Sequence, residues 1–332
     1  MKIEQLIKPL TLYNGRNPVT QEERDKFMSF IHKLKSTRKA RFIYRGNSNV
    51  IEDYGTDIDD MPLLAEYLFC IGDKGRYFYD KKFQTINKIF SFIWHRFHNK
   101  VCKLVFSSTE TKELVSRFLE KNPELCQYFS DEHNKHEFEN KSLLPIEKAI
   151  IVADYYSSLL HTIGKSGFDK SYFLSSSTEH SVADEFKGEN DIIIFGWLPR
   201  KGIDEQVDFN PTETHEKQRE IVKALNLPVE RFCFPVKRMC LPVYNGSIHP
   251  EQKEISLKCG ILPHYIIGFQ HKNDFYINPN TLKEWNDSVV FDGLDIDQKD
   301  FCKFFNSTKL KQSYICCEGL YYIISKNDIA QI

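Results

Sequence analysis

Residues 191–199 read Asp-Ile-Ile-Ile-Phe-Gly-Trp-Leu-Pro, and they contain the longest apolar run of the chain, Ile192–Leu198. An uninterrupted run of this kind is typical of a strand buried on both faces of a sheet, because a half-exposed strand alternates polar and apolar residues. The run is far shorter than the roughly 18 residues that indicate a membrane-spanning helix. We therefore expect a soluble protein built around this strand, with no membrane partner.

Other strands are predicted on both sides of this run. Residues 41–45 have strand composition and end at the turn-forming cluster 46–49. A short strand at 172–174 leads into a serine-rich turn and a helix. Residues 254–258 alternate polar and apolar side chains, and we expect 264–270 to pair with them.

Helices are predicted from capping signals and apolar spacing. Thr20 and Glu23 form a capping box, and apolar residues then recur at helical spacing, which predicts a helix over 21–35. Further helices are expected over 83–99, 109–121, 145–161 and 213–225.

Length and composition fit an ordinary globular protein of 332 residues, with 41% hydrophobic and 27% charged residues. The charged N-terminus is unlike a signal peptide, so we expect a cytoplasmic protein. We predict an N-terminal helical segment at 1–37, a main domain at 38–270 with an insertion at 204–247, and a C-terminal α/β extension at 271–332.

Several motifs are incomplete. The nine cysteines have no regular spacing, which favours reduced and mostly buried thiols over a zinc site or a disulfide framework. The pairs His95-x-x-His98 and His133-x-x-His136 lack the glutamate and third ligand of a metalloprotease, so we predict no metal site. Gly164-Lys-Ser is not a phosphate loop, because Leu159 stands where the first glycine is needed.

The net charge of −1 neither favours nor disfavours binding to nucleic acid, but basic residues cluster locally along the chain. Residues 74–103 hold eight basic residues against Asp80 alone, interleaved with aromatic rings. This composition is typical of a surface that binds phosphates and stacks on bases. It equally describes an amphipathic helix whose rings face the core. The sequence leaves both interpretations open.

Three segments carry a family pattern: Tyr44-Arg45-Gly46 at a strand end, Phe173-Leu-Ser175-Ser176-Ser177 before a helix, and Gln252-Lys253-Glu254 opening a strand that leads to Gly260. In this order they resemble the Arg–Ser–Glu class of mono-ADP-ribosyltransferases, the C3-like, iota-like and cholera-like toxins. Ala183 and Phe186 fall where that family has a small residue and an aromatic residue. Two departures are Ser176 in place of threonine and the long insertion before Gln252.

The resemblance implies an α+β fold of ADP-ribosyltransferase type, with two packed, mainly antiparallel sheets flanked by helices and NAD bound between them. It implies that Arg45 binds the NAD phosphates, as suits a guanidinium group. Gly46, without a Cβ, would approach the nicotinamide amide, and Phe186 would stack on the nicotinamide ring.

The remaining implied roles concern catalysis. The loss of nicotinamide leaves a ribose with oxocarbenium character, which Glu254 would stabilise through the 2′-hydroxyl. Ser175 would hold that carboxylate, and Ser177 would support the turn. Gln252, two residues before Glu254, would lie on the same side of the strand and face the acceptor.

NAD is thus expected as a substrate. In the family, glutamine at the position of Gln252 accompanies modification of asparagine or of nucleobases, which disfavours an arginine acceptor. The sequence therefore predicts an ADP-ribosyltransferase toxin of a toxin–antitoxin or phage-defence system, with a nucleic acid favoured over protein as acceptor and an antitoxin as a further partner. Alternatives are an injected effector that modifies a non-arginine protein side chain, an NAD glycohydrolase, and a binding module without catalysis.

Overall fold

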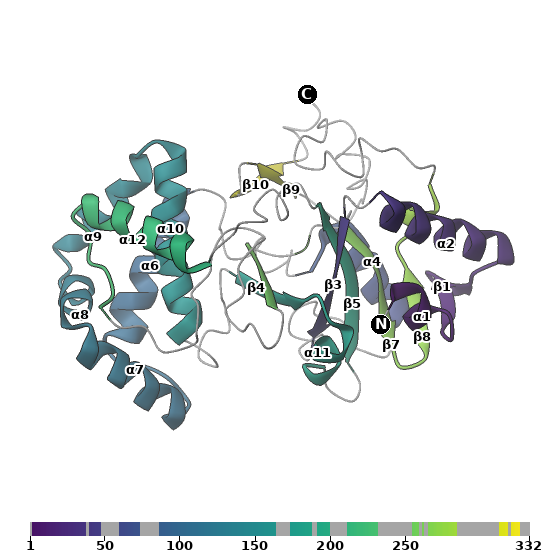
Figure 1. Cartoon of the computed structure of the whole chain (residues 1–332), viewed down its shortest axis with the longest axis horizontal. Helices are drawn as coiled ribbons and strands as arrows, with labels where there is room; N and C mark the ends of the chain where they lie inside the picture. Colours follow the sequence, from purple (N-terminus) through teal and green to yellow (C-terminus); the bar gives the residue numbers. More distant parts are fainter. Residues whose placement is uncertain are drawn as a thin grey trace. The chain divides into compact units, whose positions relative to one another are not determined.

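The computed structural model describes residues 2–37, 40–47, 60–73, 86–163, 173–187, 191–199, 211–231, 254–258, 261, 265–283, 312–317 and 320–325. The chain forms two compact units, a sheet unit and a helical unit (Figure 1). The sheet unit comprises Met1–Lys81, Leu174–Val207 and Gln252–Ile332. The helical unit comprises Lys82–Phe173 and Asp208–Glu251. This division differs from the expected domain at 38–270, since most of the expected insertion belongs to the helical unit.

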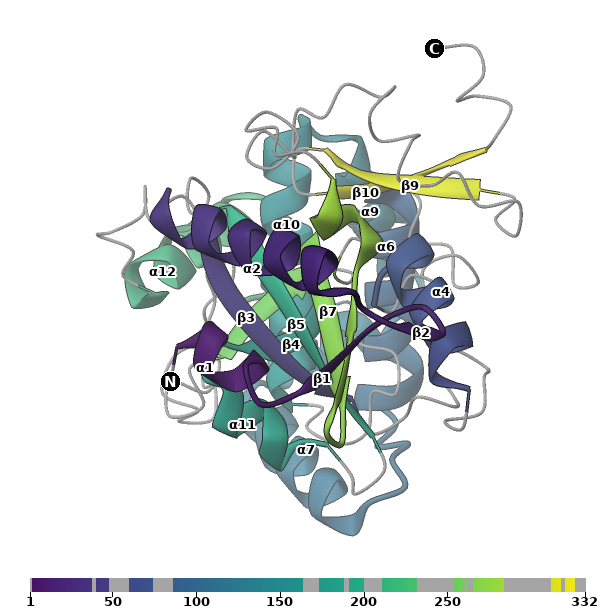
Figure 2. The ribbon, with the colours of Figure 1, turned by 90° about the vertical axis from the view of Figure 1, so that its right-hand side faces the viewer.

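The core of the sheet unit is an eight-stranded sheet of strand order β2-β1-β8-β7-β5-β3-β4-β6 (Figure 2). Strands β1 and β8 run parallel, whereas the successive pairs from β8 to β4 and the pair β1 and β2 are antiparallel. The strands are β1 Thr11–Asn14, β2 Asn17–Pro18, β3 Ala40–Asn47, β4 Phe173–Ser177, β5 Ile192–Pro199, β6 Glu254–Lys258, β7 Ile266–His271 and β8 Asp274–Ile277.

The predicted doubly buried strand is confirmed as β5. Residues Ile192, Ile193, Ile194 and Phe195 are each 0% exposed. Strand β3 pairs with one edge of β5 along its whole length, from Ala40 opposite Pro199 to Asn47 opposite Ile192. Because this pairing continues past Gly46, the strand ends later than the turn cluster at 46–49 had indicated.

The expected pairing of 264–270 with 254–258 is wrong. Strand β7 lies between β5 and β8, whereas β6 is the edge strand next to β4. The reason is apolar burial, because Ile266, Ile267 and Phe269 of β7 are almost fully buried and belong beside β5 in the centre of the sheet.

Helices α2, Gln21–Ser36, and α4, Met61–Ile71, pack on opposite faces of this sheet. The Phe27 ring of α2 lies 5.9 Å from Phe275, and the Phe69 ring of α4 lies 5.9 Å from Phe269. Phe269 pairs with Tyr276, the neighbour of Phe275, so the two contacts are on opposite sides of the pleated sheet. Figure 2 shows α2 crossing in front of the strands.

The N-terminus of α2 confirms the predicted capping box. Thr20 Oγ1 accepts from the Glu23 backbone N–H at 3.2 Å, and Glu23 Oε2 accepts from the Thr20 backbone N–H at 2.8 Å. The other helices of the sheet unit in the described ranges are α1 Ile3–Ile7, α11 His180–Glu185 and the 3₁₀ helix η6 Pro279–Leu282.

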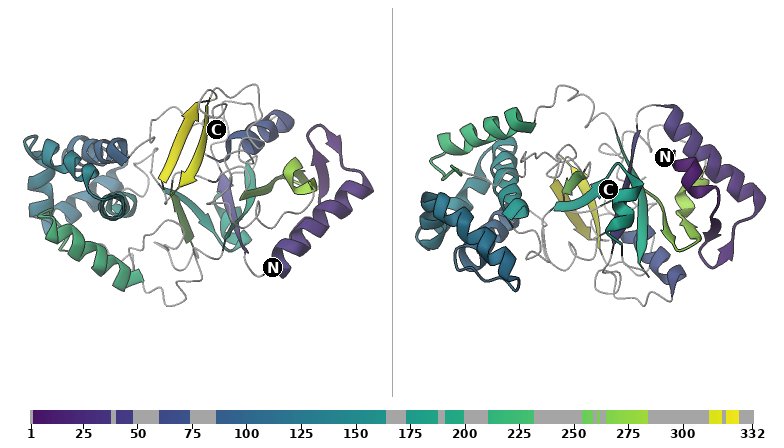
Figure 3. Two further views of the ribbon diagram at one scale, coloured as in Figure 1. Left: turned by 90° about the horizontal axis from the view of Figure 1, so that it is seen from above. Right: turned by 60° about the horizontal axis from the view of Figure 1, so that its bottom comes forward.

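The fold class is α+β, as predicted, and the described strands do not test the predicted packing of two sheets. Besides the eight-stranded sheet, they form a hairpin of β9, Gln312–Cys317, and β10, Leu320–Ser325 (Figure 3, yellow). Because β5 is paired on both edges, it joins its neighbours into one sheet, and among the described elements α2 and α4 cover the two faces of that sheet. Among the described residues, no helix is long and apolar enough to cross a membrane.

The helical unit is held together by aromatic side chains. Phe97 stacks on Phe129 at 4.4 Å, and Tyr156 packs edge-on against both Phe129 and Phe138 at 5.3 Å. Its helices are α6 Ile86–Arg96, the π-helix η1 Phe97–Val101, α7 Thr109–Lys121, α8 Pro123–Ser130, α9 Asn134–Asn140, η2 Lys141–Leu143, α10 Ile146–Ile163 and α12 Pro211–Ala224. The predicted helices at 109–121, 145–161 and 213–225 are confirmed.

Glu230, in the segment that follows α12, is a buried carboxyl group in this unit. Its backbone N–H donates to Tyr155 Oη at 3.0 Å, and its side chain is almost fully enclosed. Burial raises the pKa of Glu230 to about 7. Arg219 Nε lies 3.6 Å from Glu230 Oε1, but its side chain is 42% exposed, so the cost of burying the charged form outweighs this attraction.

This raised pKa predicts a pH-dependent stability. The folded state binds the Glu230 proton more tightly than the unfolded state, so its contribution is complete below about pH 4 and is lost as the pH rises through about 7. We expect the free energy of unfolding to fall by about 1–3 kcal/mol over this range, as measured by urea denaturation. Glu230→Gln should reduce the dependence of the free energy of unfolding on pH, whereas Glu220→Gln on the exposed side of α12 should leave this dependence unchanged. If the free energy of unfolding depended on pH equally in the wild type and in Glu230→Gln, the pH dependence could not be assigned to Glu230.

Candidate functional site

The first two segments of the family pattern and Glu254 of the third lie on three neighbouring strands. Strands β3, β4 and β6 are adjacent in the sheet, although Arg45 and Ser175 are 130 residues apart in sequence. Tyr44 of β3 is the register partner of Ser177 of β4. The Ser176 hydroxyl donates to the Ile255 carbonyl of β6 at 2.9 Å. The middle serine of the pattern thus ties β4 to the strand that begins at Glu254.

Arg45 is held by two hydrogen bonds. Its Nε donates to Asp73 Oδ2 at 2.7 Å, and its Nη1 donates to the Ser175 carbonyl at 3.0 Å. The Asp73 side chain is fully buried, and the Arg45 side chain is 15% exposed. These two bonds use two of the five guanidinium donors, and the other three could contact an anion.

The position of Asp73 is fixed independently of its side chain. Its backbone N–H donates to the Ile261 carbonyl at 2.9 Å, and its carbonyl accepts from the Ile261 N–H at 3.2 Å. Gly72, which ends α4, has a φ of 88°, a conformation that favours glycine. The sequence analysis missed Asp73, because no local spacing links it to Arg45. The one local feature that marks Asp73 in the sequence is that an acidic residue follows the glycine at the end of an apolar helix.

Gly46 lies inside β3 and against α11. A Cβ at this position would lie 2.0 Å from the Ala183 carbonyl oxygen and 2.8 Å from the Lys187 backbone nitrogen. The close approach that requires glycine is therefore made by the protein's own backbone. The family resemblance had implied that Gly46 allows nicotinamide to approach. On the Cβ side of Gly46, α11 and the residues that follow it occupy this space instead.

Ser177 and Ser175 of the serine segment make two further contacts at the site. The Ser177 hydroxyl is buried and accepts from the Glu179 N–H at 3.0 Å, which is the turn-supporting role expected of it. Ser175 contacts Arg45 through its carbonyl oxygen. The predicted contact between the Ser175 hydroxyl and Glu254 involves a side chain outside the described ones and stays a prediction.

Tyr44 anchors α11 to the sheet. Its ring lies edge-on to His180 at 5.6 Å and to Phe195 at 5.1 Å. Burial raises the pKa of the Tyr44 hydroxyl and lowers the pKa of the His180 ring. Both groups are therefore neutral near pH 7 and act as packing groups between β3 and α11.

Phe186 and Glu254 are the two remaining described residues of the predicted site. Phe186 follows α11 and is 53% exposed, so its ring is accessible to a ligand. Glu254 is the first residue of β6. Gln252 lies outside the described residues, and its predicted place beside Glu254 stays a prediction.

The described part of the basic and aromatic stretch is a core-facing helix. Phe90, Trp94 and Phe97 are buried, with at most 3% exposure. Phe92 is partly exposed, and the Arg96 guanidinium lies over its ring at 5.2 Å. These rings are packed within the helical unit, which favours the amphipathic interpretation over base stacking. Residues 74–85 lie outside the described residues.

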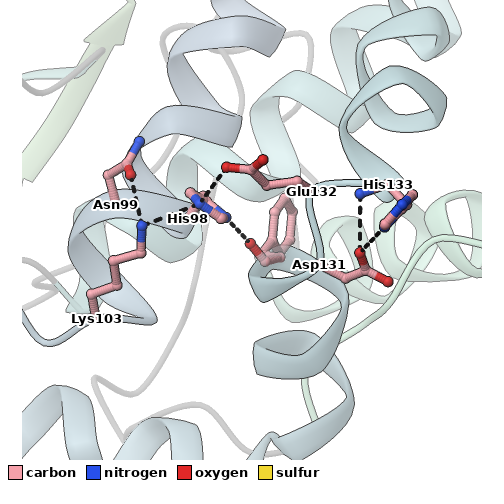
Figure 4. A network of polar contacts seen from close by, with 7 residues as sticks. His98, Asn99, Lys103, Asp131, Glu132 and His133 are labelled. Carbon is pink, nitrogen blue, oxygen red and sulfur yellow. Dashed lines mark hydrogen bonds and ion pairs between the residues drawn. The ribbon is translucent and has the colours of Figure 1, made fainter.

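His98 is a structural residue of the helical unit (Figure 4). Its Nδ1 donates to the Phe129 carbonyl at 2.9 Å, and its Nε2 accepts from Lys103 Nζ at 3.2 Å. Glu132 Oε1 lies 3.5 Å from the same Nε2. Both ring nitrogens are engaged within the protein. The described part of the chain contains no group of three or more residues that could hold a metal ion.

Comparisons with protein-family models, with curated proteins and with solved structures find no match to this chain.

Gly46→Ala should destabilise the protein, because the added methyl group overlaps the backbone of α11. Overpacking of this kind costs about 1–3 kcal/mol, which urea denaturation would measure. Ser181→Ala, on the exposed side of α11, is the control and should leave stability unchanged. If Gly46→Ala were as stable as the control, the contact with α11 would not explain the glycine.

The pair of Arg45 and Asp73 should show strong energetic coupling. Asp73→Leu removes one partner of a buried pair and should cost about 3–5 kcal/mol, because the Arg45 charge loses its counterion. Arg45→Met combined with Asp73→Leu should cost less than the sum of the two single changes. The same double-mutant cycle, in which each residue is replaced singly and then both together, is applied to the exposed pair Glu22 and Lys26 as the control. We expect little energetic coupling between these two residues. Additive effects at Arg45 and Asp73 would contradict their pairing.

Proposed function

We propose that the protein transfers ADP-ribose from NAD to a macromolecular acceptor, and that the site lies where β3, β4 and β6 adjoin. The observation that carries the proposal is the adjacency of these strands. Three short segments resemble the Arg–Ser–Glu pattern in sequence, and each alone is a common pattern. Three unrelated segments would have no reason to occupy neighbouring strands, whereas the parts of one site must do so.

Arg45 suits the phosphate-binding role in this proposal. NAD carries a pyrophosphate dianion, and charge-assisted contacts from a guanidinium group bind phosphate oxygens well. Asp73 and the Ser175 carbonyl fix the orientation of Arg45, so little side-chain freedom is lost when an anion binds. The Asp73 carboxylate also offsets part of the Arg45 charge, which favours reversible binding.

The reaction would begin with cleavage of the bond between nicotinamide and ribose. The neutral nicotinamide departs with the bonding electrons, and the ribose gains positive charge. We assign stabilisation of this charge to Glu254 at the start of β6. The accessible ring of Phe186 offers a stacking surface for nicotinamide.

The acceptor class rests on fewer observations. Gln252 favours a nucleobase or an amide side chain over arginine by resemblance. The aromatic rings of 86–103 give no further support to a nucleic acid, because most of them are buried. We retain a nucleic-acid base as the proposed acceptor, with a protein side chain as the alternative. A toxin controlled by an antitoxin would fit this activity.

Incubation of the full chain with NAD labelled in its adenylate half, together with cell lysate, tests the proposal. Label should appear in a fraction that ribonuclease or deoxyribonuclease digests. Label that only protease releases would shift the acceptor to protein. Consumption of NAD without transfer of label would indicate a glycohydrolase, and no consumption of NAD would contradict the enzymatic proposal.

Glu254→Gln should lower transfer by a factor of about 10²–10³, because one contact made in the transition state is lost. NAD binding, measured by calorimetry, should change little. Glu185→Gln, at the exposed end of α11, is the control and should retain full activity. Full transfer by Glu254→Gln would remove Glu254 from the mechanism.

A further inference from the structure

Two cysteines meet in the helical unit. Cys102 directly follows η1, and Cys126 lies in α8. The Cys102 thiol donates to the Cys126 carbonyl at 3.7 Å, and the two thiols are close enough to shift each other's pKa. Cys126 Sγ lies 3.9 Å from Ser130 Oγ. Both cysteines are free and half-buried, so a small solute can reach them.

The surrounding packing holds the two segments together. Phe97 of η1 stacks on Phe129 of α8 at 4.4 Å, and His98 Nδ1 donates to the Phe129 carbonyl at 2.9 Å. Figure 4 shows this His98 contact between the two segments. A covalent bond between the thiols would therefore join elements that are already in contact, without a long backbone movement.

We propose that Cys102 and Cys126 are a redox-reactive dithiol, which a hydroperoxide converts into a disulfide. This proposal is independent of the transferase activity. It goes beyond the expectation of reduced and mostly buried thiols, because the irregular spacing of the cysteines did not reveal that residues 24 positions apart lie side by side.

The environment of the two thiols assigns their roles. Donation from Cys102 lowers the pKa of Cys126 to about 6, and Ser130 lowers it further, whereas burial opposes both. The same hydrogen bond and burial raise the pKa of Cys102, although Ser130 and the nearby charge of Lys103 lower it. Cys126 is thus the thiolate that attacks, and Cys102 is the thiol that resolves.

The reaction balances in two steps. The Cys126 thiolate attacks one peroxide oxygen, the O–O bond breaks, and a sulfenic acid and hydroxide form. Cys102 sulfur then attacks Cys126 sulfur, the S–O bond breaks, and the departing oxygen leaves as water with the Cys102 proton. The cysteines lose two electrons, which the peroxide accepts.

Mass spectrometry of the full, pre-reduced chain tests the proposal. After hydrogen peroxide, a non-reducing digest should contain a cross-linked peptide of Cys102 and Cys126, lighter by two hydrogen atoms and reversed by dithiothreitol. The other seven cysteines are internal controls. Oxidation of those cysteines at the same rate, or no cross-link between Cys102 and Cys126, would overturn the proposal.

Two variants separate the roles of the thiols. In Cys102→Ala, dimedone should trap a sulfenic acid on Cys126, and alkylation of Cys126 at pH 6 should slow by roughly tenfold, because loss of the Cys102 donor raises the Cys126 pKa. In Cys126→Ala, Cys102 should gain no dimedone label. Equal labelling of Cys102 and Cys126 in these variants would contradict the assignment of Cys126 as the attacking thiolate and Cys102 as the resolving thiol. If either variant fails to fold, the wild-type cross-link alone decides.

Discussion

The burial of β5 is the constraint on which the rest of the sheet unit depends. Ile192–Phe195 are completely buried, so the strand needs hydrogen-bonding partners on both edges and apolar cover on both faces. Strands β3 and β7 satisfy the edges, and α2 and α4 lie on opposite faces of the sheet that β5 centres. The apolar composition of β7 follows from its central place, and the alternating composition of β6 suits an edge strand.

The same constraint places the candidate site. Pairing with β5 fixes β3 residue by residue, so alternation directs Tyr44 to one face of the sheet and Arg45 to the other. On the face of the sheet to which Tyr44 points, its ring packs against His180 of α11. Gly46 points to the same face and allows the backbone of α11 to come close. On the opposite face, Arg45 meets Asp73 at the end of α4. A single strand thus serves both as a packing surface and as a support for the charged group.

Local patterns in the sequence predicted the local structure well. The capping box at Thr20, the apolar run at Ile192–Leu198 and the turn at Ser177 depend on residues a few positions apart, and the structure has each of them. Pairing between distant segments was not predictable in this way. The partner of β7 depends on which strands are most buried, and the contact between Arg45 and Asp73 joins β3 to a helix end. The adjacency of β3, β4 and β6 was likewise not predicted, because the order of the motif segments along the chain does not determine how their strands pair.

The basic and aromatic stretch illustrates why composition alone left two interpretations. Rings and cations in one segment can bind a nucleic acid only if the rings are exposed. Phe90, Trp94 and Phe97 are spaced by four and three residues, which places them on one stripe of a helix. That stripe is buried, whereas Ser91 and His95 between its members are exposed. For the described part of the stretch, burial of this stripe favours the core-facing interpretation, which composition alone could not separate from a stacking surface.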